Sequence, residues 1–256
     1  MTFITTDRAN KTEVKIWAVL LWLIVWEIAA RSIGQEILLV SPVVVLFKFF
    51  QLMITLEFWQ SVAFSFLRII GGFILALCVG SFLAAVSSVS SFIRELMQPL
   101  IAVMKAVPVA SFIIIILIWI PSRNLAAVIS FLMVLPVVYK NILEGIERMD
   151  RQLLEMAEVF KVSHLKRFRY IYLSQIMPYF KIASSLSLGL CWKAGVAAEV
   201  IGIPQGSIGE KLYEAKVYLQ TPDLFAWTFT IVLLSAGFER LYLIVVDNLV
   251  KKVERG

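Results

Sequence analysis

The side chains that could carry out chemistry in this chain are few and scattered. There is one histidine, His164, and there are two cysteines, Cys78 and Cys191, both within apolar runs. A buried apolar setting is ordinary for a free cysteine, so we predict no disulfide, metal or redox role for either one. A single imidazole excludes histidine-rich catalysis and histidine metal cages. Nucleophiles, metal ligands and paired acids do not cluster, so we expect the chain not to be an enzyme.

The segment GIPQGSIGEKL at 202–212 resembles a phosphate-binding loop only loosely. That loop requires Gly, four residues, and then Gly-Lys followed by Ser or Thr. Here Glu210 separates Gly209 from Lys211, and Leu212 replaces the hydroxyl residue. We interpret the segment as a turn-rich outer loop, and we expect the chain to bind no cofactor itself.

The composition indicates a membrane protein. Apolar residues make up 60% of the chain and charged residues 16%, with a mean hydropathy of +0.87. In soluble domains, about 45–50% of the residues are apolar and about 25% are charged. Six membrane helices of about 20 residues would use about half of the chain, which leaves no room for a second folded domain. The net charge of +6 then fits basic cytoplasmic loops better than nucleic-acid binding.

The hydropathy pattern predicts an all-α integral membrane protein with six transmembrane helices. We expect them at 16–30, 61–87, 99–120, 125–145, 178–200 and 224–249. Ser41 followed by Pro42 is typical of a helix start, and we interpret 35–59 as an amphipathic helix on the outer surface. Residues 1–60 thus hold the first helix and this amphipathic helix, and residues 61–256 hold a five-helix core.

Three further features bear on these helices. Glu27 is expected to join helices, and Pro108 and Pro136 are expected to kink them. A cleaved signal peptide is the alternative for the first run, because it follows a basic flank and contains EIAARS. We favour a retained helix, because Glu27 interrupts the apolar region.

The distribution of Lys and Arg predicts the orientation. If the N-terminus lies inside, thirteen of these residues fall in inner segments and five in outer ones. Basic residues favour the cytoplasmic side, so both termini are predicted to be cytoplasmic. The inner segments include the N-terminal flank, with Arg8, Lys11 and Lys15, and the polar stretch LLEMAEVFKVSHLKRFRYIYLSQIMPY at 153–179.

This polar stretch is predicted to form two short helices between the fourth and fifth spans. Asp150 can cap the first helix and Ser163 the second. Apolar side chains recur at helical spacing in both, and Lys166 and Arg167 fall on the other side of the second. Two interpretations stay open: the helices fold back on the bilayer surface, or a groove of a partner protein buries their apolar face.

The stretch resembles the coupling loop of ABC importer permeases. The family motif has Glu-Ala-Ala, three residues, Gly, and later a hydrophobic-Leu-Pro ending, and it is matched here by Glu155, Met156, Ala157, Phe168, Ile171 and Leu173. Lys161 stands where glycine is expected, and Ser174 where proline is expected. Lysine in a left-handed turn costs roughly 1 kcal/mol more than glycine, so the break is either milder or displaced to Ser163.

The resemblance extends over residues 40–250. SFLRIIGGF, KAVPVASFIII, LPVVYKNILEGI and GLCWKAGVAAEVIG are similar to permeases of the nitrate, sulfonate and taurine importers. It implies a homodimeric permease in a bacterial inner (cytoplasmic) membrane, two cytoplasmic ATPases that bind ATP and Mg²⁺, and an external substrate-binding protein. The ATPase-coupling residues that it implies are Glu155, Ala157, Val159, Phe160, Lys161, Ser163 and Phe168.

Charges inside the spans are the other functional candidates, because charge within a membrane is costly. Arg68 and Glu199 lie toward the same outer side, so they either form an ion pair or separately meet water or headgroups. Lys105 and Lys193, the latter beside Trp192, would suit an anionic substrate if they line a central cavity. Alternatively, they pair structurally with carboxylates or carbonyls. The small residues around Lys193 favour close helix packing, with a dimer axis as one option.

The sequence therefore favours the permease subunit of an ATP-driven importer of a small anion. A secondary transporter without an ATPase is one alternative, but it predicts an inverted repeat that we do not see. An importer of a thiamine-precursor-like heterocycle is another. The residues do not identify the substrate.

Overall fold

The computed structural model describes residues 16–255, and their side chains up to Asn248. The predicted basic flank with Arg8, Lys11 and Lys15 lies outside the described residues, as do the side chains of the basic C-terminal end. Over the described range the regular structure consists of helices only, which confirms the all-α prediction.

The helices follow one another with short connections. In chain order they are α1 (Ile16–Ile33), α2 (Pro42–Met53), α3 (Leu56–Val89), α4 (Ser91–Ala106), α5 (Val109–Leu117), α6 (Ser122–Glu147), α7 (Arg151–Val159), α8 (His164–Arg167), the π-helical turn η1 (Phe168–Tyr172), α9 (Leu173–Gly202), α10 (Ile208–Val217) and α11 (Thr221–Arg255).

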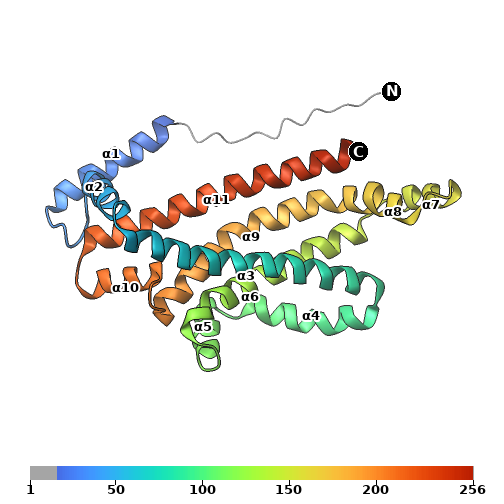
Figure 1. Ribbon diagram of the computed structural model, residues 1–256, viewed down its shortest axis with the longest axis horizontal. Helices are drawn as coiled ribbons and strands as arrows, with labels where there is room; N and C mark the ends of the chain where they lie inside the picture. Colours follow the sequence, from blue (N-terminus) through green and yellow to red (C-terminus); the bar gives the residue numbers. More distant parts are fainter. Residues whose placement is uncertain (1–15, 256) are drawn as a thin grey trace.

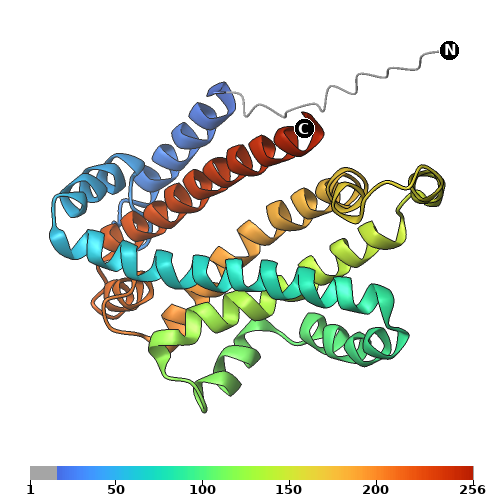
Figure 2. The same cartoon turned by 45° about the vertical axis from the view of Figure 1, so that its right-hand side comes forward.

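The long helices α3, α6, α9 and α11 run side by side along the long axis of the molecule (Figures 1 and 2). The α3–α4 turn, α7, α8 and the end of α11 gather at one end, on the right in Figure 1. Helices α2 and α10 lie at the opposite end. The α7–α8 pair and the helices α2 and α10 thus lie at opposite ends of the described chain.

Four helices are long and apolar enough to cross a membrane: α1, α3, α6 and α11 up to Asn248. A fifth span is obtained if α4 and α5 are taken together, although they are bent by 104°. Helix α9 has 30 residues, but Lys181, Lys193 and Glu199 and several serines lower its apolar character. Its inward-facing serines and Glu199 are buried against the other helices.

The segment 99–120, expected to form the third span with a kink at Pro108, is divided into two helices. Helix α4 ends at Ala106, and α5 begins at Val109 in a new direction. Val107 is extended, with ψ 129°, because a following proline disfavours the helical conformation and supplies no N–H. Pro108 therefore divides the segment into two helices instead of kinking one helix. Pro136 was also expected to kink its helix, and it lies within the uninterrupted helix α6.

The core is formed where α3, α6 and α9 meet. Its buried side chains include Ile69, Phe73, Val134, Val138, Leu188 and Trp192. Glycine permits the closest approaches: a Cβ on Gly72 would lie 2.2 Å from the Ala127 carbonyl oxygen, and one on Gly195 would lie 2.6 Å from Ile69 Cγ1. Gly195, one of the small residues around Lys193, thus serves packing within this chain.

Helix α2 confirms the predicted start at Ser41 and Pro42, since Ser41 Oγ accepts a hydrogen bond from Val43 N at 3.2 Å. It is shorter than the expected 35–59, because Thr55 caps α3, which begins at Leu56. Phe49 is buried among aromatic rings of α3 and α11. The amphipathic face of α2 therefore packs against protein.

Charged contacts hold α2 to its neighbours. Lys48 forms a 3.1 Å ion pair with Asp223 at the start of α11. Glu27 of α1 accepts hydrogen bonds from Ser41 Oγ at 2.5 Å and from Arg31 Nε at 2.7 Å. The carboxylate of Glu27 thus joins α1 to the start of α2, in line with its expected role between helices.

Candidate functional site

Helices α7 and α8 form the helix–break–helix that the polar stretch predicts. Asp150 caps α7 as expected, since its Oδ1 accepts a hydrogen bond from Gln152 N at 2.8 Å. Ser163 precedes α8 at the N-cap position, but its side chain makes no capping hydrogen bond. The two helices lie together at one end of the molecule, beyond the long helices (Figure 1).

The break between the two helices lies at Lys161. Its φ is +50°, in the left-handed region that favours glycine. Val162 N donates to Ala157 O at 2.9 Å and Lys161 N donates to Glu158 O at 3.0 Å, the pair of bonds that ends a helix in a Schellman motif. The turn therefore stays where the permease motif has glycine, and it is neither displaced to Ser163 nor made milder.

Arg167 holds the two short helices together. Its Nη2 donates to Leu154 O at 2.6 Å and lies 3.5 Å from Glu158 Oε2. Asp150 N donates to Gln175 Oε1 at 2.8 Å, which joins the start of α7 to α9. Ala157 is 2% exposed, so the motif alanine packs inward. These contacts fix the geometry of the pair.

The same pair presents apolar side chains to the outside. Phe160 is 73% and Leu165 83% exposed. We define the α7–α8 apolar surface as the exposed side chains Met156, Val159, Phe160, Leu165 and Phe168. Glu155 is exposed beside it and has no ion-pair partner among the described residues. A surface of large apolar side chains on a rigid pair of helices is typical of a docking element.

Glu199 lies in a buried polar cluster near the other end of the molecule. The residue is fully buried, and its Oε2 accepts hydrogen bonds from Ser65 Oγ at 2.6 Å and from Gly209 N at 3.2 Å. Ile208 N in turn donates to Ser65 Oγ at 2.9 Å. Glu199 and Ser65 thus receive the first N–H groups of α10, where a carboxylate is favoured by the helix dipole. The cluster joins α3, α9 and α10.

Arg68 lies near this cluster but is not bonded to Glu199. Its Nε donates to Arg123 O at 2.6 Å, its Nη1 to Phe64 O at 3.3 Å, and its guanidinium lies 3.6 Å from the centre of the Phe64 ring. The ion pairs among the described side chains do not include Arg68 with Glu199. Backbone carbonyls and a ring therefore take the place of the direct pair, which was one of the two alternatives for these charges.

The other candidate charges occupy different positions. Trp192 is buried in the core of this chain, whereas the adjacent Lys193 is exposed. Lys105 is exposed at the end of α4. Neither Lys105 nor Lys193 has a carboxylate partner among the described residues. The structural pairing that was the alternative for these lysines is thus not seen in this part of the chain.

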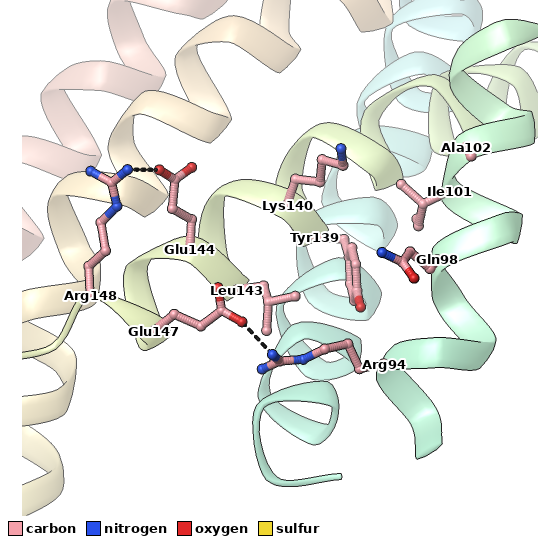
Figure 3. Close-up of a pocket in the computed structure, with 10 residues that line it drawn as sticks. All are labelled: Arg94, Gln98, Ile101, Ala102, Tyr139, Lys140, Leu143, Glu144, Glu147 and Arg148. Carbon is pink, nitrogen blue, oxygen red and sulfur yellow. Dashed lines mark ion pairs between the residues drawn. The ribbon is translucent and has the colours of Figure 1, made fainter. Parts of the chain in front are cut away.

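A pocket of about 600 Å³ opens between α4 and α6 (Figure 3). Arg94 Nη1 and Glu147 Oε1 form a 2.7 Å ion pair across it, and Arg148 pairs with Glu144 at 2.8 Å. Lys140 also lines the pocket and belongs to neither pair. Gln98 adds an amide to its wall. The pocket is therefore lined by both charged and apolar side chains, and its two arginines are paired with carboxylates.

The segment at 202–212 is a turn followed by a helix, not a loop throughout. Gly206, with φ +77°, forms the turn, and Ser207 caps α10 by accepting from Glu210 N at 2.9 Å. Lys211 forms ion pairs with Glu57 at 2.6 Å and Glu214 at 3.1 Å. Partial burial opposes its charge, but these two carboxylates raise the pKa of Lys211 above its ordinary value.

Several residues of these sites were missed by sequence reasoning. Ser65 is a small polar residue in an apolar run, and nothing in the sequence indicates that it meets Glu199. In the sequence Arg167 resembles an ordinary surface cation, and nothing indicates that it donates a hydrogen bond to Leu154 O. Lys140 had a usable signal, because it is a charge within an expected span.

Comparisons with known proteins show the family to which the chain belongs. Residues 76–255 match the family described as "Binding-protein-dependent transport system inner membrane component". The chain is 30% identical over 202 residues to a putative aliphatic sulfonates transport permease protein, SsuC, of Escherichia coli (strain K12), covering 77% of this chain and 75% of the relative.

Other relatives are similar over comparable lengths. The nitrate import permease protein NrtB of Synechococcus elongatus is 25% identical, covering 76% of this chain and 73% of the relative. The bicarbonate transport system permease protein CmpB of the same organism is 23% identical, covering 62% of this chain and 57% of the relative. On the family match and the Escherichia coli relative together, the chain belongs to the inner membrane components of binding-protein-dependent transport systems.

Proposed function

We propose that this chain is the transmembrane permease subunit of an ATP-driven importer of a small anion. The α7–α8 apolar surface is the observation that carries the proposal, because it is exposed on a fixed helix pair outside the long helices. The membership of the chain in a binding-protein-dependent transport family supports the same function. The chain itself carries out no bond chemistry.

In this proposal the chain crosses the membrane six times. The six spans are α1, α3, the bent pair α4–α5, α6, α9 and α11. At 1.5 Å per residue, the 30 residues of α9 reach about 45 Å, which exceeds the roughly 30 Å of a hydrocarbon core. Its buried serines and Glu199 are tolerated because they face other helices rather than lipid. Both termini and the α7–α8 pair then lie in the cytoplasm.

The α7–α8 pair is the coupling element. Glu155, Ala157, Val159, Phe160, Lys161, Ser163 and Phe168 would enter the groove of a cytoplasmic ATPase that binds ATP and Mg²⁺. Two permease copies, as a homodimer, would bind two ATPase subunits and receive substrate from an external binding protein. Closure of the ATPases on ATP would draw the paired loops together and open the pathway outward, and hydrolysis would return it inward.

The substrate class follows from the relatives. Their names specify aliphatic sulfonates, nitrate and bicarbonate, which are all small oxyanions. Exposed lysines without carboxylate partners suit an anion, so Lys105 and Lys193 are placed along the translocation pathway. Buried Trp192 backs Lys193 from the core. Arg68 and Glu199 are intramembrane charges whose proposed role is to fix the outer ends of the helices.

Cysteine cross-linking to the ATPase tests the coupling element. In a Cys78→Ser background, Phe160→Cys and Leu165→Cys are each compared with Ile54→Cys, which is 88% exposed but lies between α2 and α3 at the opposite end. We expect a short bifunctional reagent to join the first two variants to the ATPase and not the third. Equal cross-linking from all three positions, or none from Phe160→Cys and Leu165→Cys, would contradict the proposed coupling.

A further inference from the structure

Lys161, at the break between α7 and α8, has a backbone conformation that is unfavourable for a lysine. Its φ is +50°, and the permease motif that the stretch resembles has glycine at this position. Glycine reaches the left-handed region without steric cost, whereas a residue with a Cβ does not. A side chain held in an unfavourable conformation points to a role for that side chain.

The contacts that hold the two short helices together do not use the Lys161 side chain. The turn is closed by main-chain bonds, from Val162 N to Ala157 O and from Lys161 N to Glu158 O. Arg167 supplies the side-chain contacts between the two helices. The side chain of Lys161 is exposed, and its ammonium group has no ion-pair partner among the described residues. Its role therefore lies outside the folding of the helix pair.

Lys161 lies between members of the α7–α8 apolar surface. In the chain it directly follows Val159 and Phe160 and precedes Leu165, which are all exposed. A partner that covers these apolar side chains also removes water from the groups beside them. An ammonium group that loses water in this way weakens the complex unless a carboxylate of the partner receives it.

That carboxylate must come from the partner. Within the helix pair, Glu158 lies 3.5 Å from Arg167, and Asp150 accepts the hydrogen bond that caps α7. The exposed Glu155 forms no ion pair with Lys161. The helix pair lies beyond the ends of the long helices (Figure 1), where a cytoplasmic protein meets it more readily than the bilayer does.

We propose that Lys161 forms an ion pair with a carboxylate in the ATPase groove and so determines which ATPase this chain accepts. The inference rests on the proposed function and adds the chemistry of the partner: an aspartate or glutamate faces position 161 in the docked complex. A groove with a neutral or basic residue at that place leaves the ammonium group unpaired, so such an ATPase binds less tightly.

Carbodiimide cross-linking identifies the residue that faces Lys161. The reagent condenses an amine with a carboxylate in direct contact, so an amide forms and a water molecule is lost. It is applied to the full-length chain in complex with the ATPase that co-purifies with it, and the joined peptides are sequenced by mass spectrometry. We expect Lys161 to be joined to an aspartate or glutamate of the ATPase. Lys161→Arg should lose this product, because a guanidinium group is not coupled.

Titration of the same ATPase onto the full-length chain measures the contribution of the charge. Lys161→Met and Lys161→Gly should each weaken ATPase binding about tenfold, because each leaves the groove carboxylate without its partner. Lys161→Gly also removes the unfavourable conformation, so its weaker binding cannot be attributed to a less stable turn.

Two further variants make the result specific. Lys161→Arg keeps the charge and should bind the ATPase like the wild type. Lys166→Met should also bind like the wild type, because Lys166 is an exposed lysine of α8 with an ordinary helical backbone and no ion-pair partner among the described residues. High salt should reduce the difference between the wild type and Lys161→Met, since salt screens an ion pair at the edge of an interface.

Several results would overturn the inference while the wild-type chain still binds the ATPase. They are the absence of a cross-link from Lys161 to an ATPase carboxylate, an ATPase affinity that Lys161→Met and Lys161→Gly leave unchanged, and an equal loss of affinity in Lys166→Met. An effect of Lys161→Met that appears in phosphatidylglycerol nanodiscs but not in phosphatidylcholine nanodiscs would assign the lysine to a lipid headgroup instead. A folded wild-type chain that binds no ATPase would overturn the proposed function itself.

Discussion

At the scale of single residues, Lys161 adopts the left-handed backbone conformation of the motif's glycine, although this conformation is unfavourable for lysine. The backbone adopts φ +50° at the position where the permease motif has glycine. Lysine has a Cβ that clashes in this conformation, and glycine does not. The Schellman hydrogen bonds from Val162 and Lys161 therefore hold the turn against a local cost. Sequence reasoning identified that cost but not its outcome.

Replacing Lys161 with glycine should stabilise the turn. Removing the Cβ relieves the left-handed conformation, so Lys161→Gly should raise the free energy of unfolding by about 1 kcal/mol. Lys166→Gly is the matched control, because Lys166 lies within α8, where glycine lowers stability by about 1 kcal/mol. Thermal unfolding in detergent measures both. A lower unfolding temperature for Lys161→Gly would contradict the left-handed turn.

The Ser65 hydroxyl should contribute strongly to the stability of the protein. In Ser65→Ala, the Glu199 carboxylate and the Ile208 N–H both lose a partner in a buried site. Leaving buried polar groups unpaired costs about 1–3 kcal/mol each, so the variant should unfold at a clearly lower temperature. Ser88→Ala is the control on the same helix, because the partly exposed Ser88 side chain donates only to the Ala85 carbonyl. Equal stability of the two variants would count against the cluster.

At the scale of elements, the sequence predicted the helices better than their contacts. The cap at Ser41, the cap at Asp150 and the two-helix break follow from local chemistry and are confirmed. The division of 99–120 into two helices was not predicted, because an apolar run does not show whether a proline bends a helix or divides it. The partner of Glu199 was also missed, because serines in apolar runs give no sign of which helix they face.

The α3–α6 contact depends on a glycine without a side chain. A Cβ on Gly72 would lie 2.2 Å from the Ala127 carbonyl oxygen, whereas one on the adjacent Gly71 would meet nothing within 4 Å. Gly72→Ala should therefore force the two helices apart and destabilise the protein by about 1–3 kcal/mol. Gly71→Ala should be neutral or slightly stabilising, because alanine favours helix.

Thermal unfolding and the yield of monodisperse protein distinguish this pair of variants. They differ by one position and carry the same substitution, so helix propensity contributes equally to both. If Gly71→Ala proved as damaging as Gly72→Ala, the close approach of α3 and α6 would be refuted.

At the scale of the whole molecule, the chain is a set of apolar helices with one rigid apolar protrusion. Composition and hydropathy predict a membrane protein, because this much apolar surface cannot be buried in the core of one water-soluble domain. The polar stretch at 153–179 predicts a docking element, and Phe160 and Leu165 are exposed in it. The pocket between α4 and α6 could not be predicted, because it depends on the direction of α4 after its turn.

The central claim is that the α7–α8 pair binds a separate ATPase. The most direct measurement is co-purification in mild detergent of the chain, expressed with its genomic neighbours, as wild type, as Glu155→Ala and as Glu95→Ala. Glu95 is the control, since it is also exposed and has no ion-pair partner among the described residues. We expect a stoichiometric ATPase with the wild type and Glu95→Ala, and its loss with Glu155→Ala. A folded wild-type protein that brings down no ATPase would contradict the account.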